Sequence, residues 1–580
     1  MGRGGLELLR EDLEALSLVE GTDEAEALAE TLARARRILE VKLRFEEERP
    51  ADAAPLVVIA GGTNVGKSTV FNWLVGAPVA SSSPLARHTK APTVYVHHAE
   101  LPHLRNGAFL PGYSRVLLED PSEAASEAAS QRAAYFLLGH EVDAVRRTVL
   151  VDSPDIDSTH ERNRAVAEDL LTLADAVVFV ATPEKYNDQL CIDYLRAVVR
   201  LGKRLTCVLN KGADEEVARD FRERVLPSLE HEARLLRLPY VAEGPDPATP
   251  ADYRTELRAA VLGAGEDLAE VRRRAIRGAR IALGHDLERL CARSREELSE
   301  LDRIRAELEH ALDARRDEYA RFLVGLEFYE LDQVFERVMD YFKIPVIDHV
   351  YDGLRGAVGA IGSGLSRLVG GRATVDARTA KLQARAEEDR QKVKELLEAA
   401  RAECLELPRQ QAGTLHAAVP RWLEGLAVPS VDELNALVER YQERARAESE
   451  AWIERETRRH VELLENHPYA RNALRALKGT FQVGFGLLSA YLTGGLGPWD
   501  LLIGGATERA TKLMLDKAGG YVHYQSLKAE FTAAQARLFR ELLAEAIGTP
   551  LAARIPRGVA PERLERLARA ARSLERGEAP

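Results

Sequence analysis

The chain has 580 residues, too many for one hydrophobic core, and this length predicts about three or four domains. Its formal charge is −12 at pH 7, so the chain as a whole has no electrostatic attraction for nucleic acid or anionic lipid. The spacing of the four cysteines argues against a disulfide framework and a cysteine metal site, and predicts buried thiols at Cys191, Cys207, Cys291 and Cys404.

The first 50 residues predict one or two helices. Leu and Ala recur at helical spacing from about 5 to 48, and Pro50 and Pro55 bracket a linker to the next part of the chain. No basic stretch followed by an apolar run begins the sequence, so we expect no signal peptide and a cytoplasmic location.

Short apolar runs alternate with longer amphipathic stretches from Leu56 to about Gly263. The apolar runs read LVVIA, TVLVD, AVVFVA, RLTCVLN and LPYVA, and a helical pattern follows each one. This alternation predicts an α/β domain with a mostly parallel sheet and helices on both of its faces.

A glycine-rich segment follows the first of these strands and precedes a predicted helix. It matches the pattern G-x-x-x-x-G-K-[ST], in which backbone N–H groups surround phosphates, Lys67 reaches the terminal phosphates and Ser68 ligates Mg²⁺. The predicted domain is therefore a P-loop NTPase domain. The predicted phosphate-binding residues are Gly61, Gly62, Thr63, Asn64, Val65, Gly66, Lys67, Ser68 and Thr69.

Two further positions complete a predicted magnesium site. Asp152 ends the run VLVD, where a carboxylate can hold Mg²⁺ through water. The loop SSSPLARHTKAPTVYV contains Thr89, which can close on the metal and the terminal phosphate and make this loop a switch. We prefer Thr89 because Thr93 is expected in the following strand, and an ordinary surface loop remains the alternative.

A candidate base-binding site follows the strand RLTCVL. The amide of Asn210 can bond the guanine carbonyl edge, the stem of Lys211 can cover the base, and Asp214 can accept from the guanine N1–H and amino groups. These residues favour GTP and GDP as ligands.

The string GGTNVGKSTVFNWLVG resembles the translation-factor-related GTPases, particularly their Era-like and dynamin-like branches, over about residues 53–245. DSPDIDSTHERN followed by ADAVVFVATPEKY is similar to strings in bacterial dynamin-family proteins. The resemblance implies a GTPase that uses Mg²⁺.

Two departures from the family pattern bear on activity and specificity. In the second switch, Asp155 replaces the family's glycine, and Ile156 stands where many relatives carry a water-orienting glutamine. In the base site, Ala213 takes the place of the expected aspartate, which comes one residue later. Guanine specificity and the usual positioning of water are therefore both weakened.

We predict that Lys67, Asn64 and Thr89 are the catalytic residues. The resemblance implies that Asn64 can help to hold a K⁺ ion beside the phosphates, where its charge would stabilise the transition state. The alternative is that Asn64 only stabilises the loop through hydrogen bonds.

The second half of the chain predicts a large all-α bundle or stalk. From Gly265 to about residue 344 the sequence is rich in Glu, Arg, Ala and Leu, and roughly 80 residues would form a helix on the order of 120 Å long if it were unbroken. Similar runs at about 374–407 and 431–466 favour a bundle over a single rod.

Two glycine-rich apolar segments interrupt this half, at 350–371 and 479–507. The stretch 479–499 has no charged residue, but its glycines and Pro498 favour two short arms around a turn over one membrane span of roughly 20 residues. A membrane span, a membrane-dipping hairpin and a buried core element all remain open. Five arginines within 272–280 are expected either on a solvated helical face or against lipid headgroups.

Three functions are compatible with these patterns. The first is a dynamin-like mechanochemical GTPase that self-associates through its GTPase heads and makes peripheral contact with the inner face of a membrane. The second is an Era-like ribosome-associated GTPase, although no compact basic RNA-binding module is present and nucleic acid is not an expected partner. The third is a non-catalytic nucleotide-binding scaffold.

The expected parts of the chain are an N-terminal helical segment 1–52, a GTPase domain 53–263, a helical bundle 264–477, an apolar hairpin 478–520 and C-terminal helices 521–580.

Overall fold

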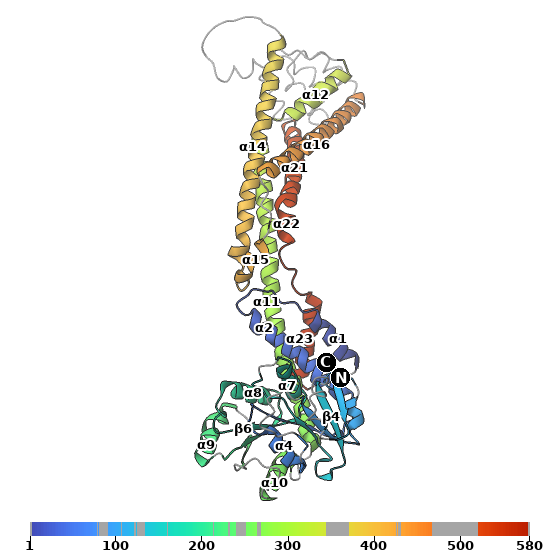
Figure 1. Cartoon of the computed structure of the whole chain (residues 1–580). Helices are drawn as coiled ribbons and strands as arrows, with labels where there is room; N and C mark the ends of the chain where they lie inside the picture. The colour runs from blue at the N-terminus through green and yellow to red at the C-terminus, as the bar shows by residue number, and fades with distance from the viewer. Residues whose placement is uncertain are drawn as a thin grey trace. The chain divides into compact units, whose positions relative to one another are not determined.

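The structure is a computed structural model. The described residues are 3–77, 79–80, 91–105, 107–120, 123, 134–158, 161–212, 214–229, 233–238, 251–263, 268–343, 371–424, 426, 431–466 and 520–577. They form two compact units, Met1–Leu298 with Gly558–Pro580, and Ser299–Arg557 (Figure 1). The finer division into five parts stays a prediction.

The first unit contains an eight-stranded sheet in the order β3-β4-β2-β5-β1-β6-β7-β8. Its strands are β1 Leu56–Gly61, β2 Thr93–His97, β3 Arg115–Leu118, β4 Tyr135–His140, β5 Val149–Asp152, β6 Ala176–Ala181, β7 Arg204–Leu209 and β8 Arg234–Arg237. Neighbouring strands are parallel except at the β2–β5 junction, which is antiparallel. The predicted mostly parallel sheet is confirmed.

The predicted strands differ from the observed ones in two places. A strand at Arg234–Arg237 directly precedes the predicted run LPYVA, of which only Leu238 is described. Strands β3 and β4 were not predicted, although β4 carries the apolar run YFLL. They extend the sheet beyond β2 on one edge.

Helices cover both faces of the sheet, as the apolar strands require. Leu56 and Val58 of β1 pack in one core cluster with α7 (Glu161–Leu173) and α8 (Gln189–Arg200). On the opposite face, Val57 and Ile59 pack in a second cluster with residues of α4 (Lys67–Val75) and α10 (Ala251–Arg258). Because neighbouring side chains of a strand point to opposite faces, a continuous run of apolar residues contributes side chains to both clusters.

Both ends of the chain contribute to one helical cluster in the first unit. Helices α1 (Arg3–Glu14), α2 (Ala25–Arg37), α23 (Pro561–Glu575) and the start of α11 (Leu268–Gly325) share a core of leucines and alanines. Arg566 of α23 also donates to Asp12 of α1, with 2.8 Å from Nε to Oδ2. The C-terminal helix is therefore part of the same unit as the sheet.

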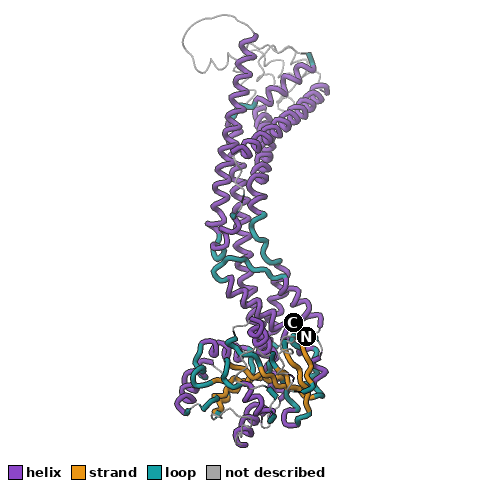
Figure 2. Tube along the Cα trace, viewed as in Figure 1, coloured by secondary structure: helices purple, strands orange, loops and turns teal. Residues whose placement is uncertain are grey.

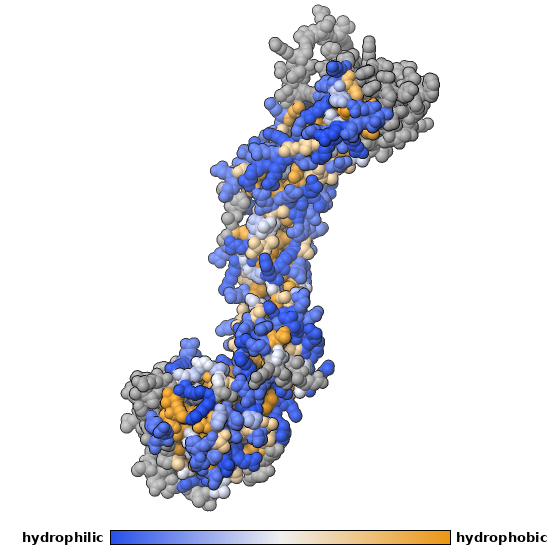
Figure 3. Space-filling model, turned by 90° about the vertical axis from the view of Figure 1, so that its right-hand side faces the viewer, coloured by the Kyte–Doolittle hydropathy of each residue, from blue (hydrophilic) through white to orange (hydrophobic). Residues whose placement is uncertain are grey.

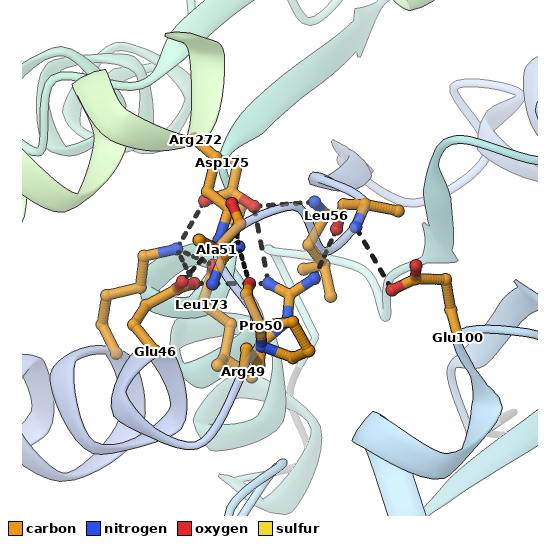
Figure 4. Close-up of polar contacts among 12 residues, drawn as sticks. Glu46, Arg49, Pro50, Ala51, Leu56, Glu100, Leu173, Asp175 and Arg272 are labelled. Atoms are coloured by element: carbon orange, nitrogen blue, oxygen red, sulfur yellow. Dashed lines mark hydrogen bonds and ion pairs between the residues drawn. The ribbon is translucent and has the colours of Figure 1, made fainter. Parts of the chain in front are cut away.

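A buried charge cluster joins the N-terminal helices to the sheet (Figure 4). Lys42, in the π-helical turn Ile38–Leu43, is fully buried and donates to Asp175 at 2.6 Å, to Glu46 at 2.9 Å and to the Leu173 carbonyl at 2.8 Å. Asp175 also accepts from the backbone N–H of Leu56 at 2.8 Å. The cluster thereby links the N-terminal segment to the start of β1 and of β6.

Arg272 of α11 belongs to the same charge cluster. Its Nε donates to Glu46 at 2.7 Å, its Nη1 donates to the Pro50 carbonyl, and the residue is only 4% exposed. This burial corrects both expectations for the 272–280 arginines at this position, because Arg272 faces neither solvent nor lipid.

The second unit is a helical bundle. Its described residues form helices and loops with no strand among them (Figure 2). The helices are the rest of α11, then α12 Tyr329–Tyr341, α14 Gly371–Gln411, α15 Val419–Leu423, α16 Val431–Asn466, α21 Gly520–Leu543 and α22 Thr549–Ala552. Tyr319 of α11 packs against Phe539 of α21, with 4.6 Å between ring centroids, and accepts a hydrogen bond from Tyr441 of α16. The predicted bundle is thereby confirmed.

On the face shown in Figure 3, hydrophilic residues cover most of the described helical unit, whereas apolar residues gather on part of the first unit.

All four cysteines are free and buried, as expected, and burial raises the pKa of their thiols. Among the helices with assigned positions, none has the length and apolar character needed to cross a bilayer. The apolar segments 350–371, apart from Gly371 at the start of α14, and 479–507 lie outside the described residues, so the alternatives for them stay open.

Candidate functional site

The glycine-rich loop connects β1 to α4 at the carboxyl end of β1. Two positions of this loop require glycine, because a side chain there would collide with neighbouring atoms. A Cβ on Gly61 would lie 2.3 Å from the Val180 carbonyl oxygen, and one on Gly66 would lie 2.2 Å from Nδ2 of Asn210. Gly66 has φ +94°, and Asn64 adopts φ +63° within the same turn. The loop is therefore tightly wrapped against β6 and the loop after β7.

Ser68 and Asp152 meet where the magnesium site was predicted. Ser68 lies in the first turn of α4 and donates from Oγ to Oδ2 of Asp152 at 2.8 Å, at the end of β5. Strand β5 is the parallel neighbour of β1, so its carboxyl end lies beside the loop. A hydroxyl and a carboxylate are oxygen ligands that suit Mg²⁺, which takes its other ligands from water and phosphate. These two residues therefore fit the metal.

Of the two threonines considered for the predicted switch, only Thr93 lies among the described residues. Thr93 begins β2, is buried and pairs with Asp152 across the β2–β5 junction, so its expected place in a strand is confirmed. Thr89 lies outside the described residues, and its metal-binding and catalytic roles stay predictions.

Lys67 has an unexpected partner. Its ammonium donates to the Gly62 carbonyl at 2.8 Å and forms an ion pair with Asp155. The residue is 7% exposed, whereas the Asp155 side chain is 37% exposed. A carboxylate from the second switch thus holds the amine that would meet the terminal phosphates.

Asp157 makes a further set of contacts with the loop. Its Oδ1 accepts from the backbone N–H and the hydroxyl of Thr63, both at 2.7 Å, and its Oδ2 accepts from Lys185 at 2.9 Å. Burial alone raises the pKa of Asp157, but the hydrogen bonds from Thr63 and Lys185 outweigh it and lower that pKa below its usual value. The hydrogen bond to Asp157 likewise raises the pKa of Lys185.

Three carboxylates of the string DSPDID therefore bind three residues of the phosphate loop. Asp152 contacts Ser68, Asp155 contacts Lys67, and Asp157 contacts Thr63. Ile156 between them is buried in the core and its N–H donates to the Gly61 carbonyl at 3.3 Å. The residue in the place of glutamine is a packing residue.

The described residues include Asn210, Lys211 and Asp214, the three residues predicted to bind the guanine base. Asn210 donates from Nδ2 to the Val65 carbonyl at 2.9 Å, which holds the loop after β7 against the phosphate loop. Lys211 adopts φ +61°. Asp214 caps α9 (Glu215–Asp220) by accepting from the N–H of Val217 at 2.9 Å. Contacts of Asn210, Lys211 and Asp214 with a guanine base stay predictions.

Sequence reasoning missed the contacts of Asp155, Asp157 and Lys185. A usable signal was present, because β1 and β6 were both predicted as parallel strands. The loops that follow parallel strands meet at one edge of a sheet, so the charged residues of TPEKY, after β6, should have been placed beside the phosphate loop.

Residues 56–211 match the family model described as 50S ribosome-binding GTPase. Residues 56–211 form a GTPase domain. The match ends at Lys211, so the helical second unit lies outside it. No protein with curated function is detectably similar in sequence to this chain.

Solved structures with similar elements include bacterial dynamins. Two are chains of an oligomerised bacterial dynamin pair, described as providing a mechanism for long-range sensing and tethering of membranes. They are 11% and 12% identical, with TM-scores of 0.44 and 0.45, and each alignment covers 99% of this chain and 96% or 95% of the other. A third is the LeoA bacterial dynamin GTPase from ETEC, 13% identical over 98% of this chain and 96% of that one, with a TM-score of 0.22.

Proposed function

We propose that the protein hydrolyses GTP with Mg²⁺ and couples turnover to self-association of its GTPase domains and to peripheral membrane contact, as a dynamin-like GTPase. The observation that carries the hydrolase proposal is the contact between Ser68 and Asp152 beside the phosphate loop. It supports a magnesium site where the two residues would share the ion with the terminal phosphates.

We propose a separate role for each part of the site. Ser68 and Asp152 would hold Mg²⁺, which would supply positive charge beside the terminal phosphate oxygens. Backbone N–H groups of the loop would hold the phosphates, and Lys67 would exchange Asp155 for a phosphate oxygen. Asn210 would keep the base-binding loop in contact with the phosphate loop. Ile156 cannot orient water, so catalysis would depend on charge stabilisation more than on a side-chain base.

The dynamin-like part of the proposal rests on the order of parts. A GTPase domain comes first in the chain, a large helical bundle follows, and the chain returns to the first unit through α23. We place the protein in the cytoplasm with peripheral contact at the inner face of a membrane.

An Era-like, ribosome-associated GTPase is the second candidate, and the description of the matching family model favours it. The net charge of −12 weighs against binding to ribosomal RNA, because neutralisation of phosphates by Lys and Arg dominates such binding. A scaffold that binds nucleotide without hydrolysing it is the third candidate.

Phosphate release measured with GTP, with ATP and with GTP plus EDTA tests the proposal. We expect turnover with GTP, at least tenfold less with ATP, and none when EDTA removes Mg²⁺. Nucleotide binding without phosphate release would favour the scaffold. Equal turnover of GTP and ATP would mean that Asp214 does not reach the base.

A further inference from the structure

Two lysines from different loops converge on one turn of the phosphate loop. The ammonium of Lys67 donates to the carbonyl of Gly62 at 2.8 Å, and that of Lys185 donates to the carbonyl of Thr63 at 3.2 Å. These carbonyls belong to successive residues. Because the P-loop lysine reaches the terminal phosphates, Lys185 lies at the same end of the predicted nucleotide.

Lys185 is fixed in place by the second switch. Asp157 accepts from Lys185 through one oxygen at 2.9 Å, and its other oxygen is held by the N–H and hydroxyl of Thr63. The backbone of Lys185 is also held in a turn, where its N–H donates to the Thr182 carbonyl at 3.0 Å. The ammonium is therefore positioned before any ligand arrives.

The loop leaves room for this arrangement at Gly62. A Cβ on Gly62 would lie 3.1 Å from Oδ2 of Asp157 and 3.6 Å from Cδ of Lys185. Both side chains thus approach the backbone of the loop directly.

The ammonium of Lys185 retains the means to bind a phosphate oxygen. Thr63 and Asp157 take two of its three N–H donors, and no third acceptor is found among the described residues. Its side chain is 34% exposed, so it is accessible to a ligand in the loop.

We propose that Lys185 is a second phosphate-binding cation, which contacts the terminal phosphate of GTP and stabilises the charge that develops there during hydrolysis. Asp157 is the positioning residue that holds it. The proposal rests on the proposed GTPase function and names the residue that supplies charge in the absence of a water-orienting glutamine. Lys185 would then supply the charge for which the family resemblance implies a K⁺ ion beside Asn64.

The first test measures GTP turnover in Lys185→Ala, with Lys381→Ala at an exposed position of α14 as a matched control. Removing one preorganised donor to a transition-state oxyanion typically lowers kcat by about 10²–10³-fold. We expect this loss in Lys185→Ala, partial recovery in Lys185→Arg, a smaller loss in Asp157→Asn, and no change in Lys381→Ala. Turnover of Lys185→Ala at the wild-type rate would overturn the proposal.

The second test does not require hydrolysis and so separates this proposal from the proposed function. Fluorescent GDP and a non-hydrolysable GTP analogue are titrated into each variant. Lys185→Ala should bind GDP as the wild type does and the GTP analogue at least tenfold more weakly, because only the triphosphate has the terminal phosphate. An unchanged ratio of the two affinities would refute the role of Lys185, even if the wild type proved to have no turnover.

A third test compares turnover in KCl and NaCl. If Lys185 supplies the charge, the wild type should turn over GTP at equal rates in both salts. A rate that depends on K⁺ in the wild type and is unaffected by Lys185→Ala would assign the charge to an ion at Asn64 instead.

Discussion

Individual carboxylates of the second switch have different partners and different consequences. Asp152 contacts Ser68, a pair that suits the shared ligation of Mg²⁺, and Asp157 holds Thr63. Asp155 differs from both, because its partner Lys67 is the amine that we predict to bind the terminal phosphates. Nucleotide bound to Lys67 in this way would break the Asp155–Lys67 ion pair.

Replacing Asp155 by asparagine should strengthen nucleotide binding. The variant removes a charge that competes with phosphate for Lys67, and a partly exposed ion pair is worth up to about 1 kcal/mol, or about a fivefold change in Kd. Titration with fluorescent GDP measures it. Weaker binding by Asp155→Asn would mean that Asp155 supports the loop and does not compete with the ligand.

Lys67→Ala should abolish measurable binding of GDP and GTP analogues. The buried ammonium is the cation that we predict to meet the phosphates, and its loss would remove a charge-assisted hydrogen bond to them. The circular dichroism spectrum of the variant serves as the folding control. Binding at the affinity of the wild type would place the nucleotide elsewhere.

Short segments of the N-terminal region act as elements that connect the sheet to its helices. The π-helical turn Ile38–Leu43 carries Lys42, and α3 (Arg44–Glu47) carries Glu46, so both charges enter the cluster beside Asp175. Arg272 brings the start of α11 into the same cluster (Figure 4). The three elements are therefore coupled through buried ion pairs.

Glu46→Gln should destabilise the first unit by about 3–5 kcal/mol, because removing one partner leaves buried cations without compensation. Urea unfolding followed by circular dichroism measures the change. Glu40→Gln, at a partly exposed ion pair with Arg44 on the same segment, is the control and should cost less than about 1 kcal/mol. Equal effects of the two substitutions would contradict the cluster's role.

The same cluster predicts a dependence on pH. Burial alone raises the pKa of Glu46, but the charges of Lys42, Arg49 and Arg272 outweigh it and lower the pKa to about 2, from an ordinary value of 4.5. Because the folded pKa is depressed, the stabilisation is fully present above about pH 4.5 and is lost as the pH falls toward about 2. The difference in unfolding free energy between wild type and Glu46→Gln should therefore shrink over this range. A difference that stays constant from pH 6 to pH 3 would exclude this linkage.

The whole molecule combines a GTPase domain with a helical bundle, and the boundary between the two compact units falls within α11. Turnover that responds to self-association should rise with protein concentration by more than direct proportion, and anionic liposomes should raise it further if the chain contacts membrane. Phosphate release across protein concentration, with and without such liposomes, measures both effects. Strict proportionality in both conditions would remove support for the dynamin-like proposal and leave the GTPase assignment intact.

The sequence alone determined the phosphate loop, the strands around it and the bundle, because each depends on local patterns. G-x-x-x-x-G-K-S between an apolar strand and a helix predicts a P-loop, and parallel buried strands are continuous apolar runs. Asp152 could be predicted for the same reason, since it ends such a run beside the loop.

Only the tertiary structure decided which charged residues meet. Lys185 is 122 residues from Thr63, and Lys42 is 133 residues from Asp175, so no local periodicity connects either pair. Their contacts depend on strand order, which brings the loop after β6 beside the loop after β1, and on the π-helical turn that directs Lys42 into the cluster. Ile156 shows the same limit, because its place in the string indicated a missing catalytic group whereas packing made it part of the core. Long-range pairing of charges follows from the folded arrangement of the strands, which a one-dimensional pattern does not contain.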